Sequence, residues 1–180
     1  MLRTLDSLLI LVIYVDDIMI TGSSALPIVV VKDILHDRFS MIDMGPLQYF
    51  LGIEITQDAL GIKISQSKYA RDILDRFHLT NCKSRTTPFQ SWVHLQDGGD
   101  TPLVDNKLYR KLLESLLYLT HTRLDLSYVV GAISRYMQEP HELHWKTPKR
   151  IFIYVQGTTS DGVHYAIGCT LDLMEFTDYD

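Results

Sequence analysis

The sequence predicts an α+β fold in which strands and helices are segregated along the chain rather than alternating. Short apolar runs separated by turn residues occupy the first 64 residues, and apolar residues with helical spacing dominate residues 65–157. The chain has 180 residues, of which 46% are hydrophobic and 22% charged. This composition is that of a globular domain, and it excludes a disordered protein.

The first strand is expected over residues 8–15, a continuously apolar run that suits a strand buried on both faces in the middle of a sheet. The run is too short to cross a membrane, which takes about 20 apolar residues. Asp16 and Asp17 interrupt it, and residues 18–20 continue it. Two apolar runs around a two-residue polar break predict a β-hairpin.

A helix is expected after Ser23 or Ser24, either of which can cap it. Its predicted inward stripe is formed by Val31, Ile34, Leu35 and Phe39. A second hairpin is expected over residues 49–64, because two further strand signals flank a turn that contains Gly61.

Four helices are then expected between residues 65 and 157, each with one apolar face. The second begins after Asp105 and the third near Asp125. The fourth lies within residues 142–155. A proline is unfavourable in a helix interior, and the alternative is a new helix capped by Thr147 with Pro148 at its first position, which would place a break after Trp145.

The sharpest chemical feature is the segment Tyr14-Val15-Asp16-Asp17. Adjacent ionised carboxylates repel each other and are costly to desolvate at the end of a sheet. A divalent cation relieves both costs, and Mg²⁺ prefers such hard oxygen ligands. Two ions about 4 Å apart can clamp the attacking and leaving oxygens in nucleotidyl transfer. On these four residues alone, an ordinary Asp-Asp turn remains the alternative.

Further motifs follow that segment in order. Residues 20–22 (Ile-Thr-Gly) come directly after it, and residues 45–55 form the next conspicuous block. The helical region contributes short motifs at residues 65–70, 108–110, 117–120, 122–123, 144–146 and 149–151. Together these segments resemble the reverse transcriptase of copia-type LTR retrotransposons, and the likeness covers nearly the whole chain.

The resemblance implies a division into three parts. Residues 1–64 would form a partial polymerase palm of antiparallel β-hairpins plus a helix, and residues 65–157 a helical thumb or connection. Residues 158–180, where strand signals return, would be the truncated start of a ribonuclease H-like domain. Asp178 matches the first acid of that domain's metal site, with a frayed polar end as the alternative. The upstream palm aspartate and the fingers are expected to be missing.

The resemblance also implies the activity of an RNA-directed DNA polymerase, which uses two Mg²⁺ ions, an RNA or DNA template-primer and deoxynucleotides. Asp16 and Asp17 would be its catalytic metal ligands, and Tyr14 would lie near the incoming nucleotide or the primer end. The hairpin at residues 50–54 would hold the primer terminus, where Gly52 lets the backbone approach a sugar-phosphate. A strand bulge is the alternative for Gly52. Without the missing parts, this fragment is expected to be inactive alone.

Two sets of basic residues at helical spacing would contact the nucleic-acid backbone. They are Lys107, Arg110 and Lys111 in one set, and Lys146, Lys149 and Arg150 in the other. A solvated helix face is the alternative for each set. The net charge of −5 and the pI of about 5.7 argue against a whole surface that grips nucleic acid. Two further alternatives remain open. One is a non-catalytic nucleic-acid-binding fragment built from these basic helix faces, which the acidic net charge disfavours, and the other is an inactive transposon relic.

Some residues depart from the family pattern or carry no functional signal. Glu114 stands where the family usually has glycine, and Leu124 replaces an expected proline. Cys82 and Cys169 match neither a disulfide framework nor a zinc site. Because no targeting signal is recognised either, the protein is expected to be intracellular, in the cytoplasm or nucleus.

Overall fold

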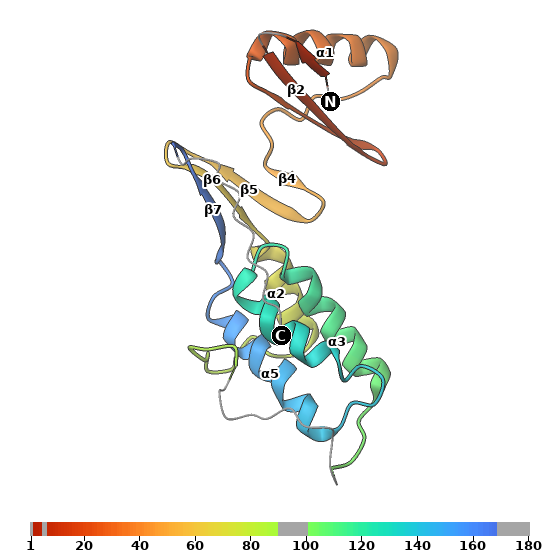
Figure 1. Ribbon diagram of the computed structural model, residues 1–180, viewed down its shortest axis with the longest axis vertical. Coiled ribbons are helices and arrows are strands. Elements are labelled where there is room, and N and C mark those ends of the chain that lie inside the picture. The colour runs from red at the N-terminus through yellow and green to blue at the C-terminus, as the bar shows by residue number, and fades with distance from the viewer. Residues whose placement is uncertain (1, 5–6, 90–100, 169–180) are drawn as a thin grey trace, which may run out of the picture. The chain divides into compact units, whose positions relative to one another are not determined.

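A computed structural model describes residues 2–4, 7–89 and 101–168 and divides the chain into two compact units, Met1–Leu47 and Gln48–Asp180 (Figure 1). The predicted α+β class is confirmed, because the described residues contain antiparallel sheets and five α-helices. None of the helices in these ranges combines the length and the apolar character that a membrane crossing requires.

The first unit is a three-stranded antiparallel sheet with one helix packed on it. Its elements are β1 (Leu2–Thr4), β2 (Ser7–Tyr14), β3 (Asp17–Gly22) and α1 (Ala25–Arg38). The strand β2 is central, and α1 contacts β3. The predicted hairpin is confirmed by six residue pairs between β2 and β3, from Leu9↔Gly22 to Tyr14↔Asp17. The three residues of β1 are too few to show a period, so this strand was not predicted.

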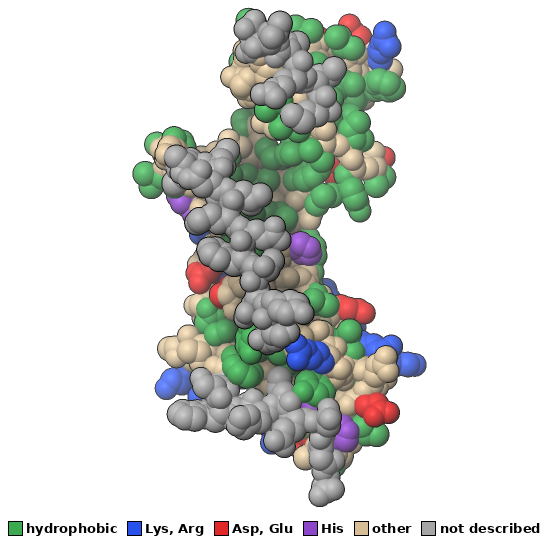
Figure 2. All heavy atoms as spheres, in the orientation of Figure 1, with side chains coloured by type: hydrophobic (Ala, Val, Ile, Leu, Met, Phe, Trp, Pro, Cys, Tyr) green, Lys and Arg blue, Asp and Glu red, His purple; other side chains and the backbone are tan. Residues whose placement is uncertain are grey.

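Two burial predictions for this unit are wrong. The central strand is not buried on both faces, since Leu9 is 7% exposed but Ile13 is 67% exposed. Helix α1 buries no residue fully, and its supposed inward residues Ile34 and Phe39 are exposed. The reason is that apolar residues surround α1 instead of forming one stripe, and a single helix leaves much of the small sheet uncovered. Figure 2 shows hydrophobic side chains at the surface of this unit.

The second unit joins a four-stranded antiparallel sheet to a bundle of helices. Its strands are β4 (Tyr49–Phe50), β5 (Ile53–Gln57), β6 (Gly61–Ser65) and β7 (Gly162–Ala166). They lie in the order β4-β5-β6-β7, so the chain leaves the sheet after β6, forms the helices and returns to pair β7 with β6 (Figure 1). The described part of the segment expected to begin a ribonuclease H-like domain is thus paired with β6, and Asp178 lies outside the described residues.

The four predicted helices of the second unit are confirmed. They are α2 (Ser67–Arg76), α3 (Asn106–Leu119), α4 (Ser127–Ser134), which follows a 3₁₀ turn at Leu124–Leu126, and α5 (Glu142–Gln156). Their apolar faces form one core around the fully buried Tyr109 and Phe152. Leu117 is an exception to the predicted inward face of α3, because 41% of it is exposed.

Helix α5 runs without interruption through Pro148, so the alternative with a break after Trp145 is wrong. A proline inside a helix removes one hydrogen bond and costs about 3 kcal/mol. Here the residues on both sides are fully buried, with His144 before the proline and Ile151 and Phe152 after it. Packing on the core therefore holds both halves in a single helix.

Candidate functional site

The two acidic residues predicted to bind metal lie at the end of the β2–β3 hairpin. Tyr14 pairs with Asp17, which leaves Val15 and Asp16 as the two residues of the turn. The turn therefore lies one residue earlier than the predicted break at Asp16 and Asp17, and Asp17 belongs to β3. Val15 has a φ of +50°, in the left-handed region that β-branched residues rarely adopt. Tight two-residue hairpin turns require a positive φ at this first position, where glycine or asparagine is favoured. The turn therefore holds local strain, of the order of 1–3 kcal/mol.

The carboxylates of Asp16 and Asp17 are adjacent in sequence and both side chains are exposed. Within the described residues neither forms an ion pair, and no three His, Cys, Asp or Glu side chains gather as a possible metal site. Two carboxylates suit Mg²⁺ chemically, but they leave most of its coordination positions to water or phosphate. The pair thus fits Mg²⁺ as a partial ligand set, and its catalytic role stays a prediction. So does the role of Tyr14, whose ring is 55% exposed.

The strand expected to begin at residue 49 is divided by a turn at Leu51 and Gly52, between the paired residues Phe50 and Ile53, and the predicted turn at Gly61 joins β5 to β6. The β4–β5 hairpin around Leu51-Gly52 is called the second hairpin from here on. Both turn residues have positive φ, +49° for Leu51 and +79° for Gly52, which is the type I′ pattern. The hydroxyl of Tyr118 on α3 donates a hydrogen bond of 2.7 Å to the carbonyl oxygen of Leu51. A Cβ atom at position 52 would overlap that hydroxyl. Glycine is therefore required twice over, and Gly52 lies in a tight turn rather than a strand bulge.

Glu54 fastens the same hairpin to α2. Its Oε1 accepts a hydrogen bond of 2.6 Å from the backbone N–H of Lys68 in the first turn of that helix. A carboxylate there satisfies an otherwise unpaired N–H and interacts favourably with the helix dipole. Because the N-cap residue Gln66 makes no side-chain capping bond, Glu54 supplies the cap from the adjoining strand. These hydrogen bonds group the hairpin with the helices, whereas from the sequence it was expected in the part formed by residues 1–64.

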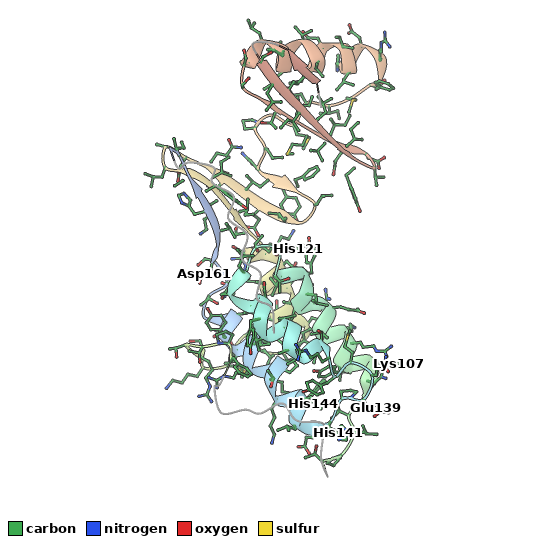
Figure 3. The ribbon with its side chains drawn as sticks, in the orientation of Figure 1. Lys107, His121, Glu139, His141, His144 and Asp161 are labelled. Carbon is green, nitrogen blue, oxygen red and sulfur yellow. The ribbon has the colours of Figure 1, made fainter. Side chains whose placement is uncertain are left out.

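Helix α3 presents the first set of basic residues on its exposed side. Successive residues turn by about 100°, so Lys107, Lys111, Glu114 and Tyr118 lie within one stripe of the helix. The first three are exposed, and Tyr118 at the far end contacts the second hairpin. Figure 3 shows Lys107 and His121 at opposite ends of α3. The two lysines and the hairpin contact are thus aligned.

The two arginines predicted to contact phosphate are partly engaged within the protein. The Nε of Arg110 donates to the carbonyl oxygen of Met137 at 3.3 Å. Arg150 is half-buried, and its Nη2 donates to the hydroxyl of Thr87 at 3.0 Å, while its Nε is buried without a hydrogen-bond partner. These side chains are less free to follow a ligand than the lysines are.

The lysines of α5 remain at the surface. Lys146 and Lys149 are both exposed, and the ammonium of Lys149 lies 5.3 Å from the ring centre of Trp145. Trp145 itself packs against the helical core, as predicted. The structure thus leaves the α5 set with two accessible charges, Lys146 and Lys149.

A polar cluster around Arg123 was not singled out from the sequence. The buried guanidinium donates to both carboxylate oxygens of Asp125, at 3.0 and 2.7 Å, and to the carbonyl oxygen of Thr158 at 2.8 Å. The hydroxyl of Tyr154 donates to the same carboxylate at 2.8 Å. Burial favours the neutral forms, but these hydrogen bonds outweigh it, so they raise the pKa of Arg123 and lower the pKa of Asp125.

Comparisons with known proteins agree with these features. Residues 3–91 match the family model described as reverse transcriptase (RNA-dependent DNA polymerase). The chain is 38% identical to the retrovirus-related Pol polyproteins from transposons RE2 and RE1 of Arabidopsis thaliana, in each case over 97% of this chain and 12% of the polyprotein. It is 37% identical to an uncharacterized mitochondrial protein of the same plant, over 94% of this chain and 70% of that protein. No solved structure matches the chain.

The class of protein is therefore a reverse transcriptase-like domain of the kind found in transposon Pol polyproteins. The chain belongs to the reverse transcriptase family, and its relatives include Pol polyproteins of copia-type transposons, which confirms the resemblance drawn from the motifs. It spans about an eighth of the length of the RE2 and RE1 polyproteins. The family model ends at residue 91, whereas the alignments with these polyproteins continue through the helices α3 to α5.

The residues that hold the second hairpin were not recognised as such from the sequence. Glu54 is a lone charge between Ile53 and Ile55, which hints at a specific partner but does not identify it. Tyr118 lies on the polar flank of an amphipathic helix and carries no local signal. The contact of Tyr118 becomes visible only in the structure, where its hydroxyl group lies against Gly52, which has a positive φ.

Proposed function

We propose that this chain carries part of the polymerase site of a copia-type RNA-directed DNA polymerase. The observation that carries the proposal is the turn at Val15, which presents two adjacent carboxylates on an exposed and strained hairpin tip. Backbone strain of this kind persists chiefly where function requires the geometry. A hairpin with no such role would be more stable with glycine or asparagine at position 15.

In this proposal Asp16 and Asp17 hold Mg²⁺ in the intact enzyme, and Tyr14 lies against the incoming nucleotide or the primer end. Bound Mg²⁺ supplies charge stabilisation for the attacking and leaving oxygens of nucleotidyl transfer. Template, primer and deoxynucleotides are the partners of that reaction. Because no third ligand joins the two carboxylates among the described residues, we expect the chain to be unable to polymerise alone.

The second hairpin and α3 would hold the primer strand. Lys111 precedes Tyr118 by seven residues and Lys107 by eleven, which correspond to about 10 and 16 Å along a helix. Phosphates of one strand rise by about 3.4 Å per nucleotide. With the primer end at the turn of Gly52, the two lysines would meet phosphates about three and five nucleotides upstream. Lys146 and Lys149 on α5 would add further contacts, with smaller contributions from the engaged arginines Arg110 and Arg150.

The three-part division into palm, thumb and the start of a ribonuclease H-like domain belongs to this proposal. The helices of the second unit would serve as the thumb. The first unit and the second hairpin would be the palm elements. Asp178 would be the remnant of the following metal site.

Binding to a labelled DNA primer annealed to an RNA template, followed by fluorescence anisotropy, tests the nucleic-acid contacts. We expect affinity to fall steeply with salt. Lys107→Gln and Lys111→Gln should each make the dependence of log affinity on log salt less steep, by about 1 in the magnitude of the slope. Lys83→Gln, at an exposed lysine outside both sets, serves as the control. Binding that is absent, or insensitive to salt, would count against this part.

Primer extension with Mg²⁺ and deoxynucleotides tests the expected lack of activity. We expect no product from this chain. Synthesis by the wild-type chain that disappears in Asp16→Asn would show instead that the catalytic site is complete. A non-catalytic nucleic-acid-binding role remains the second candidate. Such binding would depend on the lysine stripe of α3 alone. Binding that survives both Asp16→Asn and removal of Mg²⁺ would favour it.

A further inference from the structure

The turn of the second hairpin is an unfavourable conformation that the strands alone do not explain. Leu51 has a φ of +49°, in the left-handed region that is unfavourable for a residue with a Cβ atom. The strand β4 that precedes it has only two residues, Tyr49 and Phe50. So short a strand gives little support to a strained turn. A contact from outside the hairpin would stabilise this turn.

The contact comes from Tyr118. Its hydroxyl donates a hydrogen bond of 2.7 Å to the carbonyl oxygen of Leu51, and it occupies the space where a Cβ of residue 52 would lie. The same atom therefore both fixes the strained leucine and fits against the missing side chain of Gly52.

Tyr118 is itself held in place. Its ring meets the ring of Tyr69 edge-on at a centroid distance of 4.7 Å, and the hydroxyl of Tyr69 donates to the carbonyl oxygen of Ser115 at 3.3 Å. The ring centre of His121 lies 5.6 Å from that of Tyr118, and the Nδ1 of His121 is 2.8 Å from the backbone carbonyl oxygen of Tyr118. These contacts hold the Tyr118 side chain in place, so the conformation of the Leu51-Gly52 turn adjusts to the position of its hydroxyl group.

We propose that Tyr118 is a positioning residue that sets the conformation of the Leu51-Gly52 turn, so that helix α3 determines where the hairpin tip lies. Glu54, hydrogen-bonded to the start of α2, secures the strand that leaves this turn. If the hairpin holds a primer terminus, which rests on the function proposed above, Tyr118 couples the helices to recognition of the primer 3′ end. It would act through the backbone of Leu51 and Gly52, without touching the nucleic acid.

Amide hydrogen exchange of the intact chain tests the positioning directly. In Tyr118→Phe we expect the amides of residues 48–55 to exchange about fivefold faster, the effect of losing one hydrogen bond. These include the N–H of Ile55, which bonds the carbonyl oxygen of Gln48 at 2.8 Å. The amides of α4 and α5 should not change. Tyr128→Phe, which removes a hydroxyl from a ring that is 79% exposed, is the matched control. Unchanged exchange at the hairpin in Tyr118→Phe would overturn the proposal.

A second variant separates the hydroxyl contact from general loosening of the helix. In Tyr118→Phe the nearest ring atom to a Cβ at position 52 would be Cζ, at 3.2 Å, so the severe overlap is gone. Gly52→Ala should therefore speed hairpin exchange much less in the Tyr118→Phe background than in the wild type. Additive effects of the two substitutions would contradict the proposal, since they would mean that the two positions are not in contact.

Nucleic-acid binding then tests the functional consequence. We expect the wild-type chain to prefer a primer–template with a recessed 3′ end over a blunt duplex of the same length, and Tyr118→Phe to lose that preference several-fold while still binding the blunt duplex equally. If Tyr118→Phe changes exchange but retains the full preference, the coupling to primer recognition is refuted. If the wild type shows no preference, the proposed primer-holding function of the hairpin fails, while the exchange result still decides whether Tyr118 positions the turn.

Discussion

The guanidinium of Arg123 and the carboxylate of Asp125 meet through two hydrogen bonds, of 2.7 and 3.0 Å, at the edge of the helical core. The arginine side chain is 4% exposed and the aspartate side chain 41%. A third hydrogen bond to the carboxylate comes from Tyr154 on α5. The pair therefore joins the turn before α4 to α5, and the buried charge of Arg123 depends on a partner that solvent can reach.

This relationship predicts a pH-dependent stability. The folded-state pKa of Asp125 is lowered, so its contribution is fully present above the ordinary carboxyl pKa, about 4, and is lost as the pH falls through the lower folded value. At pH 7 Asp125→Asn should cost about 2 kcal/mol, less than for a fully buried pair because the carboxylate is partly exposed. Urea unfolding of the wild type and the variant at pH 7 and at acidic pH measures the difference.

The difference in unfolding free energy between wild type and Asp125→Asn should shrink as the pH falls below about 4, and approach zero below the lowered folded-state pKa of Asp125. Glu139→Gln, at an exposed carboxylate, should change stability little at either pH. A difference that is equally large at pH 7 and pH 2 would mean that the carboxylate charge contributes nothing.

Val15 offers a test of strain at the acidic turn. Val15→Gly removes the β-branched side chain from the left-handed region, a relief of roughly 1–3 kcal/mol, against a loss of about 0.5–1 kcal/mol from the added freedom of the unfolded chain. The net expectation is that the β2–β3 hairpin becomes more stable by about 1 kcal/mol. Slower amide exchange in that hairpin would show it, and faster exchange would mean that Val15 is not strained in solution.

Metal binding at the hairpin tip can be measured without polymerase activity. With Mn²⁺ as a paramagnetic substitute for Mg²⁺, we expect line broadening centred on the amides of Asp16 and Asp17, with weak affinity because only two protein ligands are at hand. Asp16→Asn should largely abolish the effect. Asp37→Asn, at an exposed acid on α1, should not. Equal line broadening at all the exposed acidic residues would show that the hairpin tip at Asp16 and Asp17 has no specific affinity for the metal ion.

Elements whose structure is determined by one local pattern could be predicted from the sequence. The carboxylates between two apolar runs predicted the first hairpin, and 3.6-residue spacing predicted the four later helices and residues such as Val130 and Ile133 in their core. Prediction failed for α1, because apolar residues all round a helix do not reveal which side packs. It also failed at Pro148, because the burial of Phe152 and other residues on either side is a property of the whole bundle.

The residues of the candidate site likewise differ in whether a local sequence pattern reveals them. Asp16 and Asp17 could be proposed from their chemistry alone, since adjacent carboxylates at a turn are conspicuous. Tyr118 and Glu54 could not be assigned their roles, because each acts through the backbone of a residue far away in the sequence, Leu51 and Lys68 respectively. The return of β7 to β6 after about a hundred residues is likewise invisible to any local pattern.

Glu114 provides a final test, because it places a negative charge between the lysines of α3 and the hairpin contact of Tyr118. At about 7 Å from a phosphate in water, a carboxylate repels it by about 0.6 kcal/mol. Glu114→Gln should therefore raise affinity for a recessed primer–template about threefold at low salt, and the gain should shrink as salt screens the interaction. Asp72→Asn, the same charge change at an exposed residue of α2, controls for net charge. An equal gain from both substitutions would show that nucleic acid does not follow the stripe of α3.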